Sequence, residues 1–549
     1  MLDEFSEYYA DFLDGTYDCV DRIVVNAYLR IGQTPGGFRT WWRSLEGSDD
    51  DLDNAHLMRM AGRFSRRVRA HAKAHNIPLI DCPAGERKHE LAEQYLPTDP
   101  NFVGVFLILV SRAPAPVWDV QRSAQGKLGN LARKTPWPYV NHYSFHILDP
   151  EWGHVTIKVS GHPPFGAQII LNGHEYVARQ AQKAQIGFTK EGNCFTQVSD
   201  AARLAQVADT LCSPDMIGRL TQVCERWIYS ACLCFALDLA EQERSGFHYD
   251  YSLYQAEYSR NLLFVRGGEM DQVFHGVIDR TRRWLDVKTL RTIFGTRKRP
   301  SRRKGKKAPR CEVVLERPTY DLTVFKLHFG KLTVKIYTKG EHVLRIEVIV
   351  HNTKALRCGR SLPKFSVIIA RLKDILNRFV NVLRWVDVST IADSRLDELP
   401  TASQVGQSRV GGVDINKPRV RAVMEAVITL SAAPSGFSSS DVAAQVRAIL
   451  ATTADQYTPR QAAYDLKKLR GKELIRQIGK SRRYESVPEG LQTMVALLTL
   501  REKVIKPVLA GAGQPKRGRK PQFPDPIDTQ YQNIQTDMRT LFQMLGVTA

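Results

Sequence analysis

The chain has 549 residues, of which 43% are hydrophobic and 25% are charged, a composition typical of a soluble globular protein with several domains. Its 78 lysines and arginines outnumber its 57 acidic residues, and the net charge of +21 favours a polyanionic partner, above all nucleic acid. No run of about 18 apolar residues predicts a membrane span, the acidic start does not resemble a signal peptide, and nine scattered cysteines without a CxxC pair exclude zinc-finger spacing. We therefore expect a cytoplasmic protein without a membrane partner.

Residues 1–200 predict an N-terminal domain that mixes strands and helices. A run rich in β-branched residues at 15–30 predicts a strand, and residues 53–75 predict a helix whose apolar face opposes a row of arginines. A second helix is expected at 85–96, and a buried strand at 102–111. This alternation of strands and helices favours an α/β or α+β arrangement.

A histidine-rich hairpin is expected next, because "VNHYSFHIL" and "GHVTIKVSG" flank the turn-like "DPEWG". Pairing Ile147 with Gly153 sets His146 opposite His154 on a polar face. The other face is then the core, formed by Tyr143, Phe145, Ile147, Val155, Ile157 and Val159. Two opposed imidazoles, with Glu175 nearby, could bind a divalent metal, for which we expect Mg²⁺ or Mn²⁺. Contact with nucleic-acid phosphates and an inert polar surface remain the alternatives.

Residues 201–296 predict a helical region, and within it "HYDYSLYQAEYSRN" gathers several tyrosines. On a helix Tyr254 and Tyr258 are four residues apart and share a face, close to Glu257. A tyrosine near carboxylates could act as a nucleophile on DNA, and a simple aromatic packing stripe is the alternative.

A basic segment at 297–310 predicts an exposed loop that binds a polyanion through Arg302, Arg303 and Lys304, unless it is a targeting or solubilising tract. Residues 311–398 then predict a small antiparallel sheet followed by an amphipathic helix.

The hairpin within this sheet carries the pattern K-x-Y-x-K, turn, R-x-E, formed by Lys335, Tyr337, Lys339, Arg345 and Glu347. The stretch 332–352 resembles plasmid and phage rolling-circle replication initiators of the Rep_trans and gene II types. The resemblance implies nicking of one DNA strand through a tyrosine, with acidic residues holding a metal. A solvated or DNA-facing sheet surface would give the same alternation. The stretch 153–176 also resembles uncharacterised bacterial proteins, which implies a family without an activity.

The Gly-, Ser- and Pro-rich segment 399–418 predicts a linker, and residues 419–509 predict three helices followed by a two-stranded wing. Thr458 is a good N-cap, Pro459 suits the first helical position, and Gln461 completes a capping box. The stretch 457–494 resembles winged-helix DNA-binding domains of the MarR type, although no pair of dimerisation helices is evident.

On the third helix of this unit, Ala463, Leu466 and Leu469 are expected to point inward. The outward residues would read base edges in the major groove and are Arg460, Gln461, Tyr464, Lys467 and Lys468. Phosphate contacts are expected from Lys480, Arg482 and Arg483 on the wing. A winged helix used for protein contacts is the alternative.

The basic tail at 510–549 contains "QPKRGRKPQFPDP", which resembles an AT-hook around Arg517 and Arg519, although Lys520 separates the second arginine from the proline. A generic basic tail is the alternative.

The sequence therefore predicts an α+β multidomain protein with a mixed α/β N-terminal body, a small antiparallel sheet in the middle and a C-terminal winged helix. The function we expect is DNA binding, on a plasmid or other mobile element, with the winged helix anchored on duplex DNA. The alternatives are a metal-dependent nuclease or nicking initiator, and a transcriptional regulator that senses a ligand. RNA also remains open as the partner of the body, because charge does not distinguish it from DNA.

Overall fold

The computed structural model describes residues 4–83, 86–122, 128–284, 293–294, 312–317, 324–329, 331–387, 397–433 and 435–502, with short pieces between 529 and 540. It is 46% helical and 28% strand, with one large central sheet and several two-stranded sheets, which confirms the α+β class.

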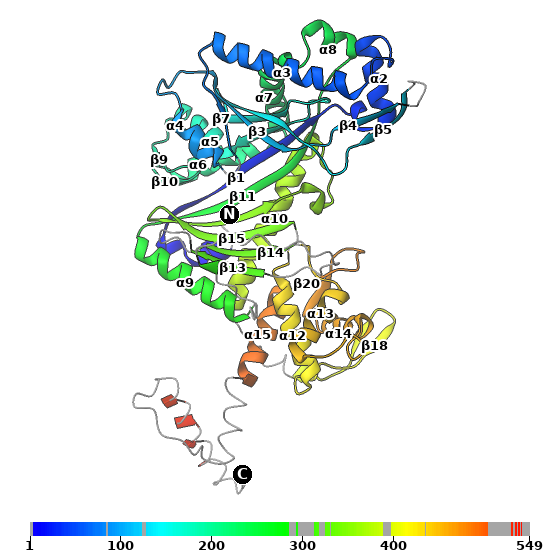
Figure 1. The fold of residues 1–549 in the computed structure, drawn as a ribbon. Helices are drawn as coiled ribbons and strands as arrows, with labels where there is room; N and C mark the ends of the chain where they lie inside the picture. The colour runs from blue at the N-terminus through cyan, green and yellow to red at the C-terminus, as the bar shows by residue number, and fades with distance from the viewer. Residues whose placement is uncertain are drawn as a thin grey trace.

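The central sheet runs diagonally through the molecule (Figure 1) and has the strand order β12-β13-β14-β15-β16-β11-β1-β8-β7-β6-β3-β2. Its strands are β1 (Leu13–Tyr28), β2 (Leu79–Asp81), β3 (Gly104–Pro114), β6 (Tyr139–Asp149), β7 (Gly153–Ser160), β8 (Ala167–Asn172), β11 (Asp250–Phe264), β12 (Ile293–Phe294), β13 (Glu312–Arg317), β14 (Val324–Phe329), β15 (Leu332–Lys339) and β16 (Val343–Val350). The two-stranded sheets are β4 (Trp118–Arg122) with β5 (Leu128–Arg133), β9 (Phe188–Lys190) with β10 (Phe195–Val198), β17 (Ser403–Val405) with β18 (Ser408–Val410), and β19 (Ile475–Gln477) with β20 (Tyr484–Ser486).

The helices are α1 (Glu4–Tyr8), α2 (Pro35–Glu46), α3 (Asn54–Ala74), α4 (Lys88–Gln94), α5 (Gly173–Lys183), α6 (Ala201–Asp209), α7 (Met216–Ala231), α8 (Leu239–Ser245), α9 (Gly267–Trp284), α10 (Phe365–Asp387), α12 (Pro418–Ser431), α13 (Ser439–Leu450), α14 (Pro459–Gly471) and α15 (Pro488–Leu500). Short 3-10 helices are η1 (Ala10–Phe12), η2 (Ile31–Gln33), η3 (Thr210–Cys212), η4 (Leu233–Phe235), η5 (Thr353–Leu356) and η6 (Leu362–Lys364).

Two expectations about strands are corrected by the sheet. The predicted small sheet in residues 311–398 is not separate, because β16 pairs with β11 and so extends the large sheet. The tyrosine-rich segment is not a helix but the long strand β11, which pairs with β1 on one side and β16 on the other. These two long-range partners, which no local pattern reveals, decide its conformation.

The histidine hairpin forms with the predicted core face but with a different register. His146 faces Thr156 and Leu148 faces His154, so the strands slide by two residues from the expected pairing. The slide shortens the loop, because Asp149 now pairs with Gly153. Asp149 fixes the backbone of this loop by accepting hydrogen bonds from the amides of Glu151 and Trp152 at 2.8 Å. Because the shift is even, the same side chains keep to the same face.

The apolar face of the hairpin packs under the helices at the top of Figure 1. Phe64 of α3 lies with its ring 5.0 Å from that of Tyr143, and Phe235 of η4 stacks on Phe145 at 5.8 Å. All six predicted core residues of the hairpin are buried. The opposite face of the hairpin is polar and forms part of the site described below.

The two halves of the sheet repeat one topology. A long strand is followed by helical structure, a parallel edge pair and an antiparallel meander that returns beside the long strand. In the first half these strands are β1, β2, β3, β6, β7 and β8, and in the second half β11, β12, β13, β14, β15 and β16. The parallel edge pairs β2–β3 and β12–β13 correspond, and the long strands β1 and β11 pair antiparallel at the centre. The sheet is therefore two related units joined edge to edge.

Sequence and pairing support this repeat. The stretch "VTIKV" of β7 corresponds to "LTVKI" of β15. The pair His146 and Thr156 has its counterpart in His328 and Thr333, each a histidine opposite a threonine in neighbouring strands. Each meander also ends on an asparagine whose side chain accepts a backbone N–H two residues on, at Asn172 and Asn352.

The C-terminal unit has the element order helix, helix, helix, two-stranded hairpin, helix, in α12, α13, α14, β19–β20 and α15. The predicted start of α14 is present in detail, because Thr458 and Gln461 form a capping box and Pro459 is the first helical residue. Arg378 of α10 forms an ion pair with Glu485 of β20 at 2.6 Å, which ties this unit to the body. The expected linker contains the hairpin β17–β18, which packs on the end of α14.

Candidate functional site

One face of the central sheet carries polar side chains and forms the floor of a cavity of about 920 Å³. The floor comes from β1, β7, β8, β6 and β11, and the walls come from α4, the start of α5 and the segment between β9 and β10. Five cationic side chains line it: Arg22, Lys88, Lys158, Lys190 and Lys339. Acidic side chains also reach it, namely Asp21, Glu93, Glu175 and Glu257. We call this the sheet cavity.

His146 and His154 meet on the floor of the sheet cavity. Nδ1 of His146 lies 3.0 Å from Nε2 of His154, and Thr156 Oγ1 lies 3.4 Å from the same Nδ1. Burial, together with the neighbouring His154 and Lys88, lowers the pKa of His146 to about 3. Burial also lowers the pKa of His154. Both imidazoles are therefore neutral at physiological pH and able to accept a proton, a hydrogen bond or a metal.

The third member of the predicted metal set is placed differently. Glu175 lines the same cavity, but its Oε1 forms an ion pair with Lys190 Nζ at 2.5 Å. The structure therefore brings the two histidines together, whereas the carboxylate of Glu175 is paired with Lys190.

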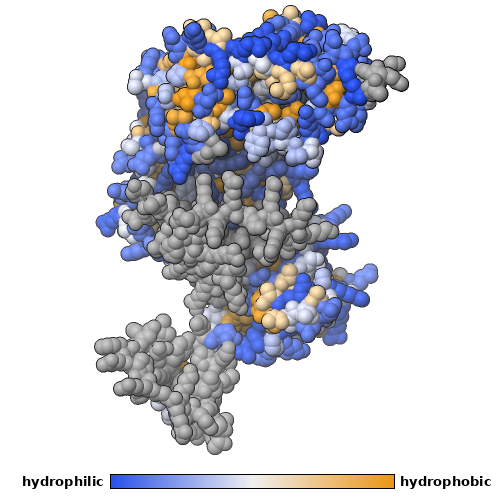
Figure 2. All heavy atoms as spheres, in the orientation of Figure 1, coloured by the Kyte–Doolittle hydropathy of each residue, from blue (hydrophilic) through white to orange (hydrophobic). Residues whose placement is uncertain are grey.

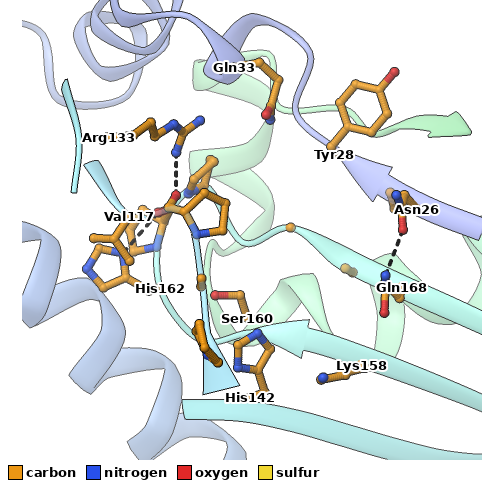
Figure 3. Close-up of a pocket in the computed structure, with 18 of the residues that line it drawn as sticks. Asn26, Tyr28, Gln33, Val117, Arg133, His142, Lys158, Ser160, His162 and Gln168 are labelled. Carbon is orange, nitrogen blue, oxygen red and sulfur yellow. Dashed lines mark hydrogen bonds between the residues drawn. The ribbon is translucent and has the colours of Figure 1, made fainter. Parts of the chain in front are cut away.

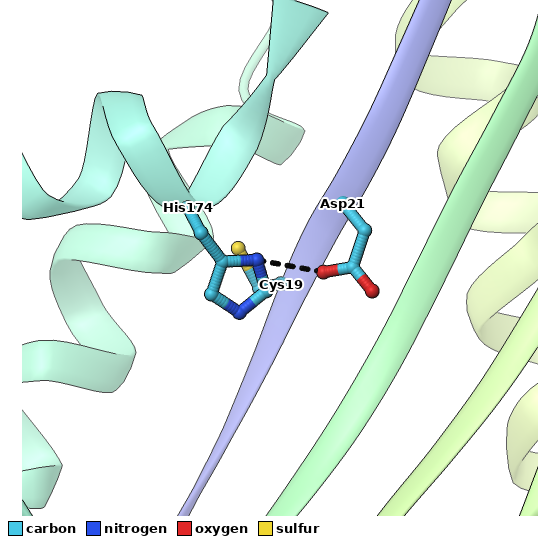
Figure 4. A group of neighbouring side chains, drawn as sticks. All are labelled: Cys19, Asp21 and His174. Carbon is cyan, nitrogen blue, oxygen red and sulfur yellow. Dashed lines mark ion pairs between the residues drawn. The ribbon is translucent and has the colours of Figure 1, made fainter. Parts of the chain in front are cut away.

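A buried ionic network crosses β1, β11, β16 and the start of α5 next to the sheet cavity. His174 Nδ1 lies 2.7 Å from Asp21 Oδ1 (Figure 4), and Arg345 donates through Nη2 to Nε2 of His174 at 3.2 Å. Since a guanidinium only donates, this contact assigns the imidazole proton to Nδ1, which faces Asp21. Although burial opposes ionisation, Arg345 and His174 hold the pKa of Asp21 below its ordinary value. Asp21 is thus a buried carboxylate with Arg345 as its cation.

Arg345 is held in place by further contacts. Its Nε donates to Asn261 Oδ1 and its Nη2 donates to the carbonyl of Asn193, both at 2.6 Å. Ser259 Oγ donates to Asp21 at 3.0 Å. Three strands and the loop between β9 and β10 thus converge on one guanidinium, so the network fixes the centre of the sheet.

Two further carboxylates lie on this face. Glu347 of β16 forms an ion pair with Lys335 of β15 at 2.9 Å. Burial raises the pKa of Glu347 to about 7, with Asp21 and Glu257 adding to the rise and Lys335 opposing it. Burial and the charge of Asp21 also raise the pKa of Glu257. A raised pKa is a property that a general acid or base needs, but Glu347 is itself buried and does not line the sheet cavity.

Cys19, Asp21 and His174 are the one group of three metal-ligating side chains whose donor atoms lie within 4.8 Å of one another in the described residues. Their surroundings do not favour a cation. Arg345 Nη1 lies 3.7 Å from Asp21, and burial raises the pKa of the Cys19 thiol well above its ordinary value. The group is better explained as part of the ionic network.

A second cavity, of about 490 Å³, continues along the polar face beyond Lys158, which lines both (Figure 3). Its lining includes His142, Arg133 and Arg360, with Gln168 donating to Asn26 Oδ1 at 3.0 Å across the floor. The two cavities together form a polar groove over β6, β7, β8 and β1.

The predicted tyrosine nucleophiles do not face this groove. Tyr258 is buried on the opposite face of β11, where its hydroxyl donates to Asp18 at 3.0 Å, and burial raises its pKa. Glu257 follows the alternation of the strand and points into the sheet cavity instead. The expectation that Tyr254 and Tyr258 share a helix face close to Glu257 was therefore wrong, because the segment is a strand.

In the C-terminal unit, the outward face of α14 is partly as expected. Arg460 and Tyr464 are exposed, Lys467 and Lys468 are half-buried, and the Gln461 side chain is engaged in the capping box. Lys468 Nζ lies 5.0 Å from the ring centroid of Tyr464. Ala463 is exposed and Ala462 is buried in its place, so the inward residue was misassigned by one position.

The basic residues of the β19–β20 hairpin divide into two kinds. Lys480 and Arg482 are exposed at its tip. Arg483 donates to the carbonyls of Ser435 and Gly436 at 2.7 and 2.6 Å, so it holds the hairpin against the segment before α13. Five other predicted contacts lie outside the described residues: Arg302, Arg303, Lys304, Arg517 and Arg519.

Comparisons with protein-family models, curated proteins and solved structures found no match for this chain. Within the described residues, no helix combines the length and apolar character needed to cross a membrane. Among the residues coloured in Figure 2, hydrophilic ones predominate, with smaller hydrophobic patches between them.

Sequence reasoning missed several contributors to the site, among them Asp21, Lys88 and Glu93. Asp21 had a detectable signal, because it is an acidic residue inside the β-branched run "CVDRIVV" of a buried strand. Lys88 and Glu93 belong to a short polar helix, and only the folded chain brings them to the sheet.

Proposed function

We propose that this protein binds nucleic acid, DNA in the first place, along the polar groove of the central sheet. The observation that carries the proposal is the pair of lysines at its centre. Lys88 and Lys158 both line the sheet cavity, and no ion pair within the described residues engages either of them. Burial and the charge of Lys88 lower the pKa of Lys158. A phosphodiester backbone would relieve this unfavourable proximity of two cations.

The groove suits a single strand better than a duplex as the ligand. Its floor combines cationic side chains with half-buried imidazoles and amides, which can contact phosphates and unpaired bases in turn. The C-terminal unit supplies the complementary duplex contact in this proposal, through Arg460, Tyr464 and the exposed hairpin tip at Lys480 and Arg482. A cytoplasmic protein of a plasmid or other mobile element, acting where duplex and single strand meet, would need both surfaces.

Photo-crosslinking with mass spectrometry tests this assignment. A 5-bromouracil-labelled single strand should crosslink to peptides from α4 and β7, and a labelled duplex to peptides from α14 and β19–β20. Crosslinks of the single strand confined to residues 419–502 would refute binding in the groove. A labelled RNA that competes as well as DNA would reassign the groove to RNA.

A second candidate function is metal-dependent cleavage of the bound strand. It is favoured by Glu347, whose pKa of about 7 suits proton transfer, and by Glu257, which lines the sheet cavity beside the groove lysines. Supercoiled plasmid should become nicked with Mg²⁺ or Mn²⁺, and Glu257→Gln and Glu347→Gln should abolish the nicking. Tyr258→Phe is the matched control and should still nick, because that hydroxyl lies on the other face of the sheet. If the plasmid stays intact with both metals, the proposal of cleavage is refuted and only the proposal of nucleic-acid binding remains.

A further inference from the structure

The two histidines on the floor of the sheet cavity have the geometry of ligands to one ion. Their facing nitrogens, His146 Nδ1 and His154 Nε2, are 3.0 Å apart. With metal–nitrogen bonds of about 2.1 Å, that separation corresponds to an angle of about 90° at the metal. A tetrahedral ion with the same bonds would hold the two nitrogens about 3.4 Å apart. The geometry therefore fits two neighbouring positions of an octahedron.

The related unit of the sheet gives an internal comparison. There, Thr333 Oγ1 lies between His328 Nδ1 and His351 Nε2, at 3.0 and 2.9 Å. A hydroxyl donates one hydrogen bond and accepts another, so this arrangement satisfies both imidazoles without an ion. In the first unit the threonine lies to one side and the imidazoles face each other directly.

A carboxylate is available to complete the first arrangement. Glu93 of α4 is exposed, lines the sheet cavity, and acts electrostatically on His154. Glu175 also acts on His154, but Lys190 engages its side chain. Of these two carboxylates, Glu93 is the one that no ion pair within the described residues engages.

We propose that His146 and His154 are adjacent ligands of a six-coordinate first-row divalent metal ion, with Glu93 as the third protein ligand and water in the remaining positions. Two imidazoles favour transition ions such as Mn²⁺, Co²⁺ or Ni²⁺ over Mg²⁺, which prefers oxygen ligands. The ion lies on the floor of the sheet cavity, where it would be accessible to an anionic ligand.

The test uses the full chain with metal alone, so its result does not depend on nucleic-acid binding. We expect one Mn²⁺ per chain, measured as loss of the free-ion signal in electron paramagnetic resonance. Glu93→Gln should weaken binding by about tenfold, and His146→Ala or His154→Ala by more than that. Glu175→Gln and His328→Ala, the matched carboxylate and the matched histidine of the related unit, should each leave the affinity within about twofold of the unaltered chain. Bound Co²⁺ should show the weak visible absorption of an octahedral ion.

Several results would overturn the proposal. Absence of Mn²⁺ and Co²⁺ binding would mean that the imidazoles only hydrogen-bond to each other. Intense tetrahedral Co²⁺ absorption, or unchanged affinity in the folded His154→Ala variant, would also be incompatible with it. His154 is only half-buried, so this variant provides the test should His146→Ala not fold.

Discussion

Replacing the two groove lysines by glutamine tests the proposed function quantitatively. Lys88 and Lys158 line the sheet cavity together, and the change K88Q/K158Q removes two positive charges while keeping side chains of similar length. If each contacts one phosphate of a single strand, the slope of log affinity against log salt should fall by about 1.4. Between about 50 and about 200 mM salt, the variant should then lose about sevenfold less affinity than the unaltered chain.

The assay is fluorescence anisotropy with a labelled single strand over a series of salt concentrations. The matched control is R59Q/K73Q, which removes two exposed charges from α3, the helix that packs on the apolar face of the sheet. The control should keep the original slope. An unchanged slope in K88Q/K158Q, or an equal fall in the control, would refute binding in the groove.

Three further predictions concern the ionic network and the C-terminal unit. Arg345→Met should lower the free energy of unfolding by about 3–5 kcal/mol in urea titrations, because it leaves the buried charge of Asp21 unpaired; a loss below about 1 kcal/mol would contradict this reading. Because the folded-state pKa of Glu347, about 7, exceeds its ordinary 4.5, its contribution to stability is present below about pH 4.5 and lost as the pH rises through 7. The stability difference between the unaltered chain and Glu347→Gln should therefore change across that window, and a pH-independent difference would be inconsistent with it. In the β19–β20 hairpin, Arg482→Gln should weaken duplex binding without changing the melting temperature of the protein. Arg483→Gln should lower that melting temperature, because its hydrogen bonds hold the hairpin in place. The reverse pattern would mean that Arg482 is the structural residue and Arg483 the one that contacts DNA.

Local patterns predicted the local structure of this chain well. The capping box at Thr458 and Gln461 and the core face of the histidine hairpin depend only on neighbouring residues or on strand alternation, and both are present. The meeting of His146 and His154 also follows from alternation, because an even shift of register keeps both on one face.

Features set by distant partners could not be predicted in this way. The spacing of Tyr254 and Tyr258 fits one face of a helix and also one face of a strand, and only pairing with β1 and β16 decides between them. The ionic network likewise joins Asp21 to Arg345, which are more than three hundred residues apart in the sequence. Such a pair leaves no spacing signal, although a charge inside an apolar strand indicates that a distant partner must exist.

The repeated topology also bears on how the sheet avoids aggregation. A single unit would expose the whole hydrogen-bonding edge of its long first strand, the kind of edge that recruits other chains. Pairing β1 with β11 covers both edges at once, as the contact between two subunits of a symmetric dimer would. Joining the units in one chain then allows each to change separately. One keeps two facing imidazoles at His146 and His154, and the other links its imidazoles through the hydroxyl of Thr333. The threonine at the corresponding position lies beside the two imidazoles in one unit, as Thr156, and between them in the other, as Thr333.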